Sequence, residues 1–194
     1  MFSTSRDRLF ISCALGILAG DFVSKRMAEA QLTLHQPVPV LGDVLRWTLT
    51  YNTGAAMNMS LGGWSRLAFS LLAMVMIGII IRMWRSLPPA STWLAASLGL
   101  ISAGAAGNLL DRLRSARGVV DFIDVGIGDS RFWTFNVADS GVTVGAVILA
   151  IITWAEPEEA ARTAAPAAAA TVVPDANHAE GDRDGSVGDG GDSA

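Results

Sequence analysis

The acidic and amide side chains that could carry chemistry gather between two apolar segments of the chain. The run from residue 107 to 139 reads GNLLDRLRSARGVVDFIDVGIGDSRFWTFNVAD; it leaves one apolar segment, crosses a short polar loop and enters another. A charged side chain inside hydrocarbon costs about 3 kcal/mol or more, so carboxylates at a membrane boundary are functional candidates. The run therefore indicates an acid–base site at the membrane.

Asp121 and Asp139 are the two carboxylates best placed to form such a site. They are eighteen residues apart, too far to share a helix face, but the loop leaves and re-enters at one surface, so both lie at a similar depth. Two neighbouring carboxylates share one proton; the ionised member can activate water while the protonated member donates to a carbonyl oxygen. The alternative is a pair of solvated boundary aspartates, one of which caps the following helix.

Further polar residues recur at helical spacing around these two acids. Asn108, Asp111 and Arg112 stand at i, i+3 and i+4, which places them on one helix face, and Asn136 and Asp139 repeat the i, i+3 relation. Within an acid–base site these residues are scaffolding, because an arginine can hold a carboxylate or bind an anionic headgroup. The alternative is a surface ion pair at a helix end.

Polar residues also occur in the first apolar segment and after the first predicted strand. Asp21 and Lys25 are four residues apart, so we expect an ion pair along the helix or a hydrogen bond from Asp21 to a neighbouring span. Ser24 beside Lys25 is a poor nucleophile–base pair, because adjacent helical side chains diverge by about 100°. Asn52 and Gly54 are typical of a turn, although small residues here also permit an extended peptide to approach the backbone.

The composition is that of a membrane protein with a separate tail. Of 194 residues, 51% are hydrophobic and 16% are charged, whereas soluble domains carry about 25% charged residues. Residues 156–194 hold nine acidic and two basic side chains, while residues 1–155 hold nine acidic and twelve basic ones. We therefore expect a membrane domain over 1–155 and a disordered tail over 156–194, whose Ala/Pro-rich and then Gly/Asp-rich composition buries too little apolar surface to fold.

The residue types that the chain lacks argue against several other chemistries. One cysteine and two histidines are too few for a typical zinc site or for a disulfide framework within the chain, and they argue against a Ser-His-Asp triad. The chain carries no basic stripe with interleaved aromatics, which argues against nucleic-acid binding. We expect no metal and no organic cofactor.

Four apolar segments predict four membrane-spanning helices. The first begins near residue 9, and the others cover 66–82, 91–110 and 139–155. A bilayer core about 30 Å thick needs about twenty helical residues, which the third segment supplies outright. The others reach that length if their flanking charges snorkel or face a protein interior. Charged residues follow the first segment where a signal-peptide cleavage site would lie, so we expect a retained span.

Period-two patterns predict a small β-rich patch on the side where the acidic motifs emerge. The run VLRWTLTY at 44–51 alternates, with Leu45, Trp47, Leu49 and Tyr51 on one face, as in a half-buried strand. VVDFIDV and RFWTF flank a Gly-Ile-Gly-Asp-Ser turn and predict a second short pair. The expected fold class is an all-α membrane protein, with four transmembrane helices and a small extracytoplasmic β-rich patch.

Four motifs occur in an order that is known from one family. They are AGDFVSK at 19–25, YNTGAAM at 51–57, GNLLDRLRSARGVVDFIDV at 107–125 and FNVADSGVTVGA at 135–146. With these motifs the chain resembles the bacterial lipoprotein signal peptidase family, signal peptidase II, over roughly residues 8–155. Four motifs in the family's order make a specific match.

The resemblance implies an aspartic endopeptidase of the bacterial inner membrane. Such an enzyme removes the signal peptide from diacylglyceryl-modified prolipoproteins by cleaving before the lipid-modified cysteine, among membrane lipids and without a cofactor. It would have cytoplasmic termini and an active site near the outer face, and we expect a monomer. The family's catalytic aspartates fall on Asp121 and Asp139. Its supporting polar positions fall on Asp21, Asn52, Asn108, Asp111, Arg112 and Asn136. We also expect Lys25 and Gly54 to be substrate-binding or supporting residues.

The chain departs from the family's pattern at a few positions. Phe22 stands where the family usually has Gln, and Met57 stands where an aromatic residue is common. Neither change removes a group that the reaction needs. Asp124 and Asp129 are additional loop carboxylates, and we expect both to be solvated.

Two other function classes fit parts of the sequence. A membrane transporter or proton-relay protein would also use intramembrane Asp and Arg. A structural membrane adaptor would act through the acidic tail and would lose function when that tail is deleted. The order of the four motifs favours the peptidase over both alternatives.

Overall fold

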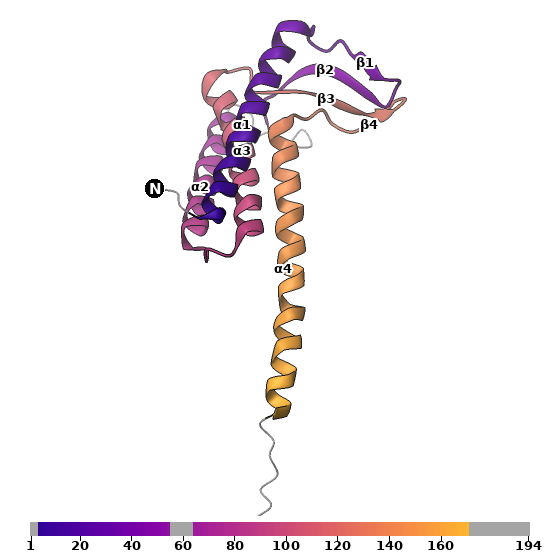
Figure 1. Cartoon of the computed structure of the whole chain (residues 1–194). Coiled ribbons are helices and arrows are strands. Elements are labelled where there is room, and N and C mark those ends of the chain that lie inside the picture. The colour runs from indigo at the N-terminus through magenta and orange to yellow at the C-terminus, as the bar shows by residue number, and fades with distance from the viewer. Residues whose placement is uncertain (1–3, 55–63, 171–194) are drawn as a thin grey trace, which may run out of the picture. The chain divides into compact units, whose positions relative to one another are not determined.

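The computed structural model describes the backbone of residues 4–54 and 64–170 and the side chains of these ranges up to residue 155. The chain divides into two units, Met1–Trp154 and Ala155–Ala194. The first unit contains the sheet and all the described helices except the later part of α4 (Figure 1). Every candidate site residue falls within its bounds.

Three helices of the first unit pack side by side. They are α1 (Ser5–Gln31), α2 (Ser65–Ser86) and α3 (Thr92–Arg114). A buried cluster that includes Phe10, Ile80, Trp84 and Leu98 joins them at the end away from the sheet, and the rings of Phe10 and Trp84 stack with centroids 4.2 Å apart. This apolar cluster holds together the end of the bundle that lies away from the candidate site residues.

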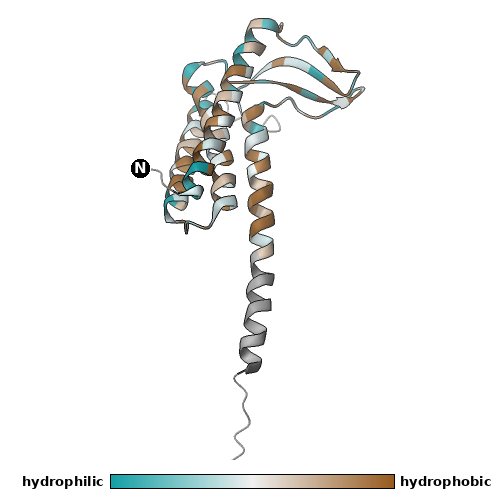
Figure 2. Ribbon diagram, in the orientation of Figure 1, coloured by the Kyte–Doolittle hydropathy of each residue, from teal (hydrophilic) through white to brown (hydrophobic). Residues whose placement is uncertain are grey.

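Three of the described helices are long and apolar enough to cross a membrane: α2, α3 and residues Val137–Ala155 of α4 (Val137–Ala170). Hydrophobic residues predominate along the first part of α4 (Figure 2). The predicted second, third and fourth apolar segments lie within these helices. The 27 residues of α1 extend about 40 Å, but Asp21, Lys25 and Arg26 lower its hydropathy. Of the four predicted spans, three thus have a helix that meets both criteria.

Glycines allow α1, α3 and α4 to approach closely near the polar end of the bundle. A Cβ added at Gly104 would overlap the carbonyl oxygen of Ala138 and lie 2.6 Å from Cγ2 of Val142 in α4. A Cβ added at Gly107 would lie 2.6 Å from Oδ2 of Asp21 in α1. Small residues are the usual means of close helix packing in lipid, and here they bring charged groups of three helices together.

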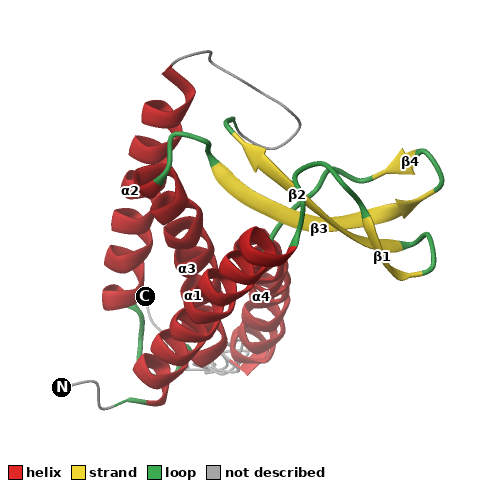
Figure 3. Ribbon diagram, turned by 90° about the horizontal axis from the view of Figure 1, so that it is seen from above, coloured by secondary structure: helices red, strands yellow, loops and turns green. Residues whose placement is uncertain are grey.

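A four-stranded antiparallel sheet lies beside the polar end of the helices (Figure 3). Its strands are β1 (Val38–Leu41), β2 (Leu45–Asn52), β3 (Val119–Ile127) and β4 (Ser130–Arg131), in that spatial order. The register pairs Thr50 with Asp121 and Asn52 with Val119. The pairing of β2 with β3 places the turn after β2 beside the candidate acid on β3.

The predicted apolar face of β2 packs against α1 and β3. Leu49 is buried with Ala28, Val120 and Phe122, and Trp47 packs against this cluster. The predicted second strand pair is only partly correct, because β4 contains Arg131 but ends there, and RFWTF adds just an isolated bridge between Phe135 and Ile123. The rest of RFWTF runs as an irregular segment into α4.

The expectation that Asp124 is solvated is wrong, whereas Asp129 is exposed as expected. Asp124 is only 8% exposed and accepts hydrogen bonds from Oγ1 of Thr48 and from Nε of Arg131, both at 2.9 Å. Sequence spacing could not reveal this burial, because Thr48 belongs to a strand that pairs with β3 from far away in the chain.

The tail that the sequence predicts to be disordered begins at residue 156. The backbone of α4 continues as a helix to Ala170, through an alanine-rich stretch whose helix propensity is high. Residues 171–194 lie outside the described residues, so disorder there stays a prediction.

Candidate active site

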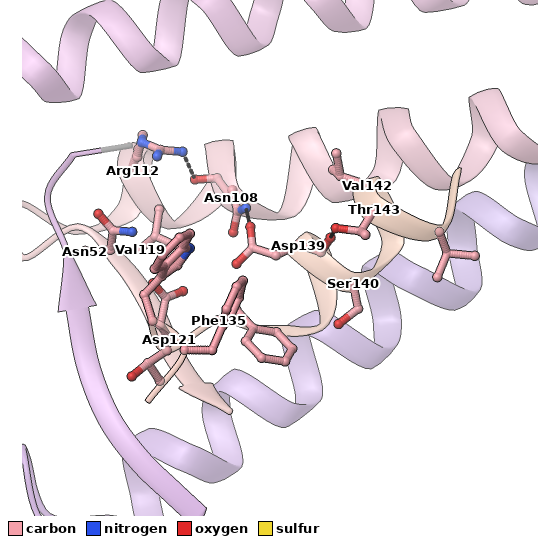
Figure 4. Close-up of a pocket in the computed structure, with 14 residues that line it drawn as sticks. Asn52, Asn108, Arg112, Val119, Asp121, Phe135, Asp139, Ser140, Val142 and Thr143 are labelled. Atoms are coloured by element: carbon pink, nitrogen blue, oxygen red, sulfur yellow. Dashed lines mark hydrogen bonds between the residues drawn. The ribbon is translucent and has the colours of Figure 1, made fainter. Parts of the chain in front are cut away.

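Asp121 and Asp139 lie at one cavity, although they come from different kinds of element. Asp121 is on β3 and Asp139 is in the first turn of α4, and both line a cavity of about 550 Å³ (Figure 4). Asp121 is only 2% exposed, so it is not a solvated boundary carboxylate. The structure thus brings together the two acids that the sequence singled out.

The first turn of α4 is capped by Asn136 rather than by an aspartate. Oδ1 of Asn136 accepts a hydrogen bond from the backbone N–H of Asp139 at 2.9 Å, and Oδ2 of Asp139 accepts one from the backbone N–H of Asn136 at 3.2 Å. This reciprocal pair is a capping box. The alternative prediction of an aspartate as the cap is therefore wrong in detail, since Asp139 occupies the third helical position.

The amide of Asn136 also binds the other acid. Its Nδ2 donates to Oδ1 of Asp121 at 2.6 Å and to the carbonyl oxygen of Val120 at 3.3 Å. Asn136 is fully buried. A single amide thus contacts both Asp121 and Asp139, which couples the start of α4 to β3.

Burial, and after it the negative charge of Asp139, raise the pKa of Asp121 to about 7. Hydrogen bonds from Asn136 and Asn52 and the positive charge of Lys25 lower the pKa but do not offset the burial. Desolvation penalises the charged form of a carboxyl group. Near neutral pH, Asp121 can therefore carry a proton.

The polar face of α3 points toward the same cavity. Nδ2 of Asn108 donates to Oδ1 of Asp139 at 2.8 Å (Figure 4). Asp111 is 6% exposed, and its ion-pair partners are Lys25 at 2.9 Å and Arg26 at 3.4 Å. The alternative of a surface ion pair between neighbours at the helix end is therefore wrong, because Asp111 turns inward to α1.

Arg112 ties α3 to the turn after β2. Its Nη2 donates to the carbonyl oxygen of Gly54 at 3.0 Å, and its Nη1 donates to that of Asn108 at 3.3 Å. Oδ1 of Asn52 accepts from the N–H of Gly54 at 3.0 Å, which is the turn that the sequence predicts. Arg112 and Asn52 both line the cavity. Residues 55–63, which include the departure at Met57, lie outside the described residues.

Asp21 makes both of the contacts that the sequence left as alternatives. Its Oδ2 pairs with Nζ of Lys25 at 2.8 Å along the helix, and its Oδ1 accepts from the backbone N–H of Ala138 in α4 at 2.9 Å. Both charged side chains are buried, at 2% and 1% exposed. Phe22, the other departure from the family pattern, is 55% exposed, with Arg26 over its ring.

The apolar wall of the cavity was not predicted. Its aromatic part comes from the segment between β4 and α4, and its aliphatic part comes from β3 and α4: Phe132, Trp133, Phe135, Val119, Val142 and Val144. The signal that could have found it is the RFWTF run, which lies between the two acids in the sequence and is unusually aromatic. Among the described residues, no group of three or more His, Cys, Asp or Glu side chains is placed to hold a metal ion.

Comparisons with known proteins identify the family. A family model described as signal peptidase (SPase) II matches residues 13–155. The lipoprotein signal peptidase of Pseudomonas paraeruginosa (strain DSM 24068 / PA7) is 44% identical over 134 residues, which are 68% of this chain and 79% of that protein. The lipoprotein signal peptidase of Mycobacterium avium (strain 104) is 40% identical over 155 residues, which cover 76% of this chain and 79% of that protein.

Two solved structures of a bacterial membrane enzyme, both determined by the in meso method, share the fold. One, at 2.3 Å resolution, has a TM-score of 0.70 and 25% identity and covers 77% of this chain and 90% of that chain. The other, at 1.9 Å resolution, has a TM-score of 0.69 and 25% identity and covers 79% and 97%. Because the family model spans nearly all of the helices and the sheet, and the relatives match over most of their own length, the chain belongs to the signal peptidase II family.

Proposed function

We propose that Asp121 and Asp139 are the catalytic pair with which this member of the signal peptidase II family removes the signal peptide from diacylglyceryl-modified prolipoproteins. The bond that is cut precedes the lipid-modified cysteine. The observation that supports this assignment is the shared cavity, in which one acid is buried and the other receives N–H donors at a helix start. Two carboxyl groups in such different surroundings suit the roles of acid and base.

The pair acts on one water molecule held between the two carboxyl groups. Asp139 takes a proton from the water, whose oxygen attacks the carbonyl carbon, while protonated Asp121 donates its proton to the carbonyl oxygen. The tetrahedral intermediate, which carries two hydroxyl groups, then collapses. Asp139 gives its proton to the leaving nitrogen and the C–N bond breaks. One of the two hydroxyl groups loses its proton to Asp121, which restores the starting protonation state. Asp121 starts in the protonated form because burial raises its pKa to about 7.

The surrounding residues hold this pair and receive the substrate. Asn108 and Asn136 orient the two acids through the hydrogen bonds described above, while Arg112 and Gly54 hold the turn after β2 against α3. The apolar wall of the cavity continues onto α4 through Val142 and Val144. We assign this wall to the lipid-modified end of the substrate, whose acyl chains enter sideways from the bilayer, and the sheet to the extended peptide.

The membrane arrangement that fits this site has four spans and one copy of the chain. The fourth span is α1, which is long enough, and its charges at Asp21 and Lys25 are buried within the protein rather than exposed to lipid. Both termini then lie in the cytoplasm, and the sheet and the acids lie near the outer face of the bacterial inner membrane. All residues proposed for the reaction belong to one chain, which is consistent with a monomer.

The decisive experiment is a cleavage assay on a diacylglyceryl-modified precursor, run beside the same precursor without lipid. We expect cleavage of the lipidated form only. Asp121→Asn and Asp139→Asn are expected to abolish cleavage while thermal unfolding in detergent stays cooperative, and the exposed-loop variant Asp129→Asn serves as the control that keeps its activity. Full activity in Asp139→Asn would refute the assignment.

The two other function classes make different predictions. A transporter or proton relay would move ions or solutes in proteoliposomes and would leave a lipidated precursor intact; the family match does not favour it. An adaptor that acts through its tail would fail when residues 160–194 are deleted. We expect that deletion to leave cleavage unchanged, because every group assigned to the reaction lies before Ala155.

A further inference from the structure

Lys25, the cation at the centre of the polar end of the bundle, does not line the cavity. Nζ of Lys25 lies 2.8 Å from Oδ2 of Asp21, 2.9 Å from Oδ2 of Asp111 and 3.0 Å from Oδ1 of Asn108. An ammonium group has three N–H donors, so these three acceptors use all of them. The side chain of Lys25 is 1% exposed.

Two partners of Lys25 hold the start of α4, where Asp139 lies. Oδ1 of Asp21 accepts from the N–H of Ala138, the residue before Asp139. Nδ2 of Asn108 donates directly to Oδ1 of Asp139. The position of Asp139 therefore depends on two side chains that Lys25 holds in place.

The third partner holds the strand that carries the other acid. Oδ2 of Asp111 accepts from the N–H of Val120 at 3.2 Å, and Val120 precedes Asp121 on β3. The same oxygen receives the ammonium of Lys25. One cation thus connects, through one intermediate residue each time, to the segments that carry both acids.

Lys25 and Asn136 together fix which way the amide of Asn108 faces, since Nζ of Lys25 at 3.0 Å and Nδ2 of Asn136 at 3.1 Å both donate to its Oδ1. An ammonium group can only donate, so the amide atom that faces Lys25 has to be the oxygen. The NH₂ group is then turned to Asp139. Without the cation, the amide oxygen loses its charged donor and keeps a neutral one, Nδ2 of Asn136. The orientation that turns the NH₂ group to Asp139 is then held less firmly, because hydrogen bonds to charged groups are the stronger ones.

We propose that Lys25 is a positioning residue for the reaction: it supports the amide orientation of Asn108, together with Asn136, and it sets the spacing of the two acids without touching substrate. This inference rests on the proposed function, since it concerns the same pair of acids. It differs from a purely structural role because it predicts a change in how the acids titrate as well as a slower reaction.

The charges that face Asp121 give the proposal its pH signature. They come from three helices: Lys25 on α1, Asp111 and Arg112 on α3, and Asp139 on α4. The charge of Lys25 lowers the pKa of Asp121. Removing that charge therefore raises this pKa, so Asp121 keeps its proton to a higher pH and the alkaline limb of the rate profile moves upward.

The test compares three variants of the full chain in detergent with a lipidated precursor, and it adds Asn108→Ala, alone and combined with Lys25→Met, as a double-mutant cycle. Lys25→Met removes the cation; Lys25→Met combined with Asp111→Asn also removes one buried negative charge and keeps an oxygen for the N–H of Val120. Arg6→Met is the matched control, since Arg6 is on the same helix and pairs with Asp7, far along α1 from the cavity. Thermal unfolding is measured for each variant.

We expect Lys25→Met to lower kcat about 100-fold, the effect of a misplacement of about 1 Å in an active site, with little change in KM. Its alkaline limb moves to higher pH, the charge-balanced variant has a similarly low kcat, and Arg6→Met matches the unmodified protein. Adding Lys25→Met to Asn108→Ala costs less than in the intact site, because the two residues act in one chain of contacts.

Several results would overturn the proposal. One is an unchanged kcat in Lys25→Met. Another is a pH–rate profile of this variant whose alkaline limb does not move. If Lys25→Met does not fold, an unchanged kcat in the charge-balanced variant also overturns it. If the unmodified protein does not cleave the lipidated precursor, the proposed function fails by itself. The role of Lys25 is then tested by infrared titration of the Asp121 carboxyl band, which is assigned by comparison with Asp121→Asn. The proposal requires that this band titrates at a higher pH in Lys25→Met than in the unmodified protein.

Discussion

Nδ2 of Asn136 lies 2.6 Å from Oδ1 of Asp121, while the other end of the same amide accepts the backbone N–H of Asp139. The residue that starts α4 is therefore also the residue that connects the two acids. Helix capping is usually a matter of stability alone. Here it also determines where the reactive groups lie, because α4 cannot begin elsewhere without moving Asp139 away from β3.

This double role of Asn136 can be separated by two substitutions. Asn136→Ala removes the cap, at about 1 kcal/mol, and removes the hydrogen bond from Nδ2 of Asn136 to the buried carboxyl of Asp121, at about 1–3 kcal/mol; the hydrogen bond from Asn52 remains. Asn136→Ser keeps an oxygen that can cap the helix but has no NH₂ group to reach Asp121. We expect both variants to lose most of their cleavage rate, with the larger drop in melting temperature for Asn136→Ala. Normal cleavage by Asn136→Ser would show that the contact with Asp121 is dispensable.

The rate of cleavage should fall on the alkaline side of neutrality. The pKa of Asp121 is raised to about 7, first by burial and second by Asp139, so Asp121 is a proton donor below that pH and a carboxylate above it. Once both acids are charged, no donor remains for the carbonyl oxygen. The check is kcat/KM measured from about pH 5 to about pH 9, a range that brackets this pKa. A profile that stays flat to the upper end would contradict a protonated Asp121.

Close packing of α3 against α4 can be tested at a glycine. A methyl group at position 104 would overlap the carbonyl of Ala138, so Gly104→Ala should destabilise the fold by about 1–3 kcal/mol and displace the start of α4. Gly16→Ala on α1 is the matched control, because a Cβ there meets nothing within 4 Å and alanine favours a helix by about 1 kcal/mol. Thermal unfolding of both variants decides the point; equal melting temperatures would argue against the tight contact.

The two loop carboxylates should respond differently to the same substitution. Asp124→Asn weakens the charge-assisted contacts that Nε and Nη2 of Arg131 make with Oδ1 of Asp124 and should cost about 2 kcal/mol. Asp129→Asn, at an exposed position, should change stability by less than about 0.5 kcal/mol. Denaturation of the two variants under identical conditions gives the comparison. An equal, small effect would mean that the contacts of Asp124 contribute little to the sheet.

The sequence predicted the helices well, because charged and small polar residues bound the apolar stretches on both sides. It also indicated that Asp121 and Asp139 meet, since a loop that leaves and re-enters one surface returns to the same depth. Neither inference needed knowledge of which side chains touch. Both followed from hydropathy and from the order of the segments.

Contacts between distant segments could not be predicted in this way. The partners of Lys25 include Asn108, 83 residues away, and the burial of Asp124 depends on Thr48, 76 residues away. Spacing within one helix offers only the partners at i+3 and i+4. The choice of Asn136 over an aspartate as the cap likewise depended on how α4 approaches β3.

The stretch that links the two acids also supplies the aromatic wall, with Phe132, Trp133 and Phe135. Lengthening or shortening it by even one residue would disturb the chemistry and the fit of the substrate together. Relatives that accept different precursors can therefore be expected to differ in the identity of these rings, while the number of residues between the acids is kept.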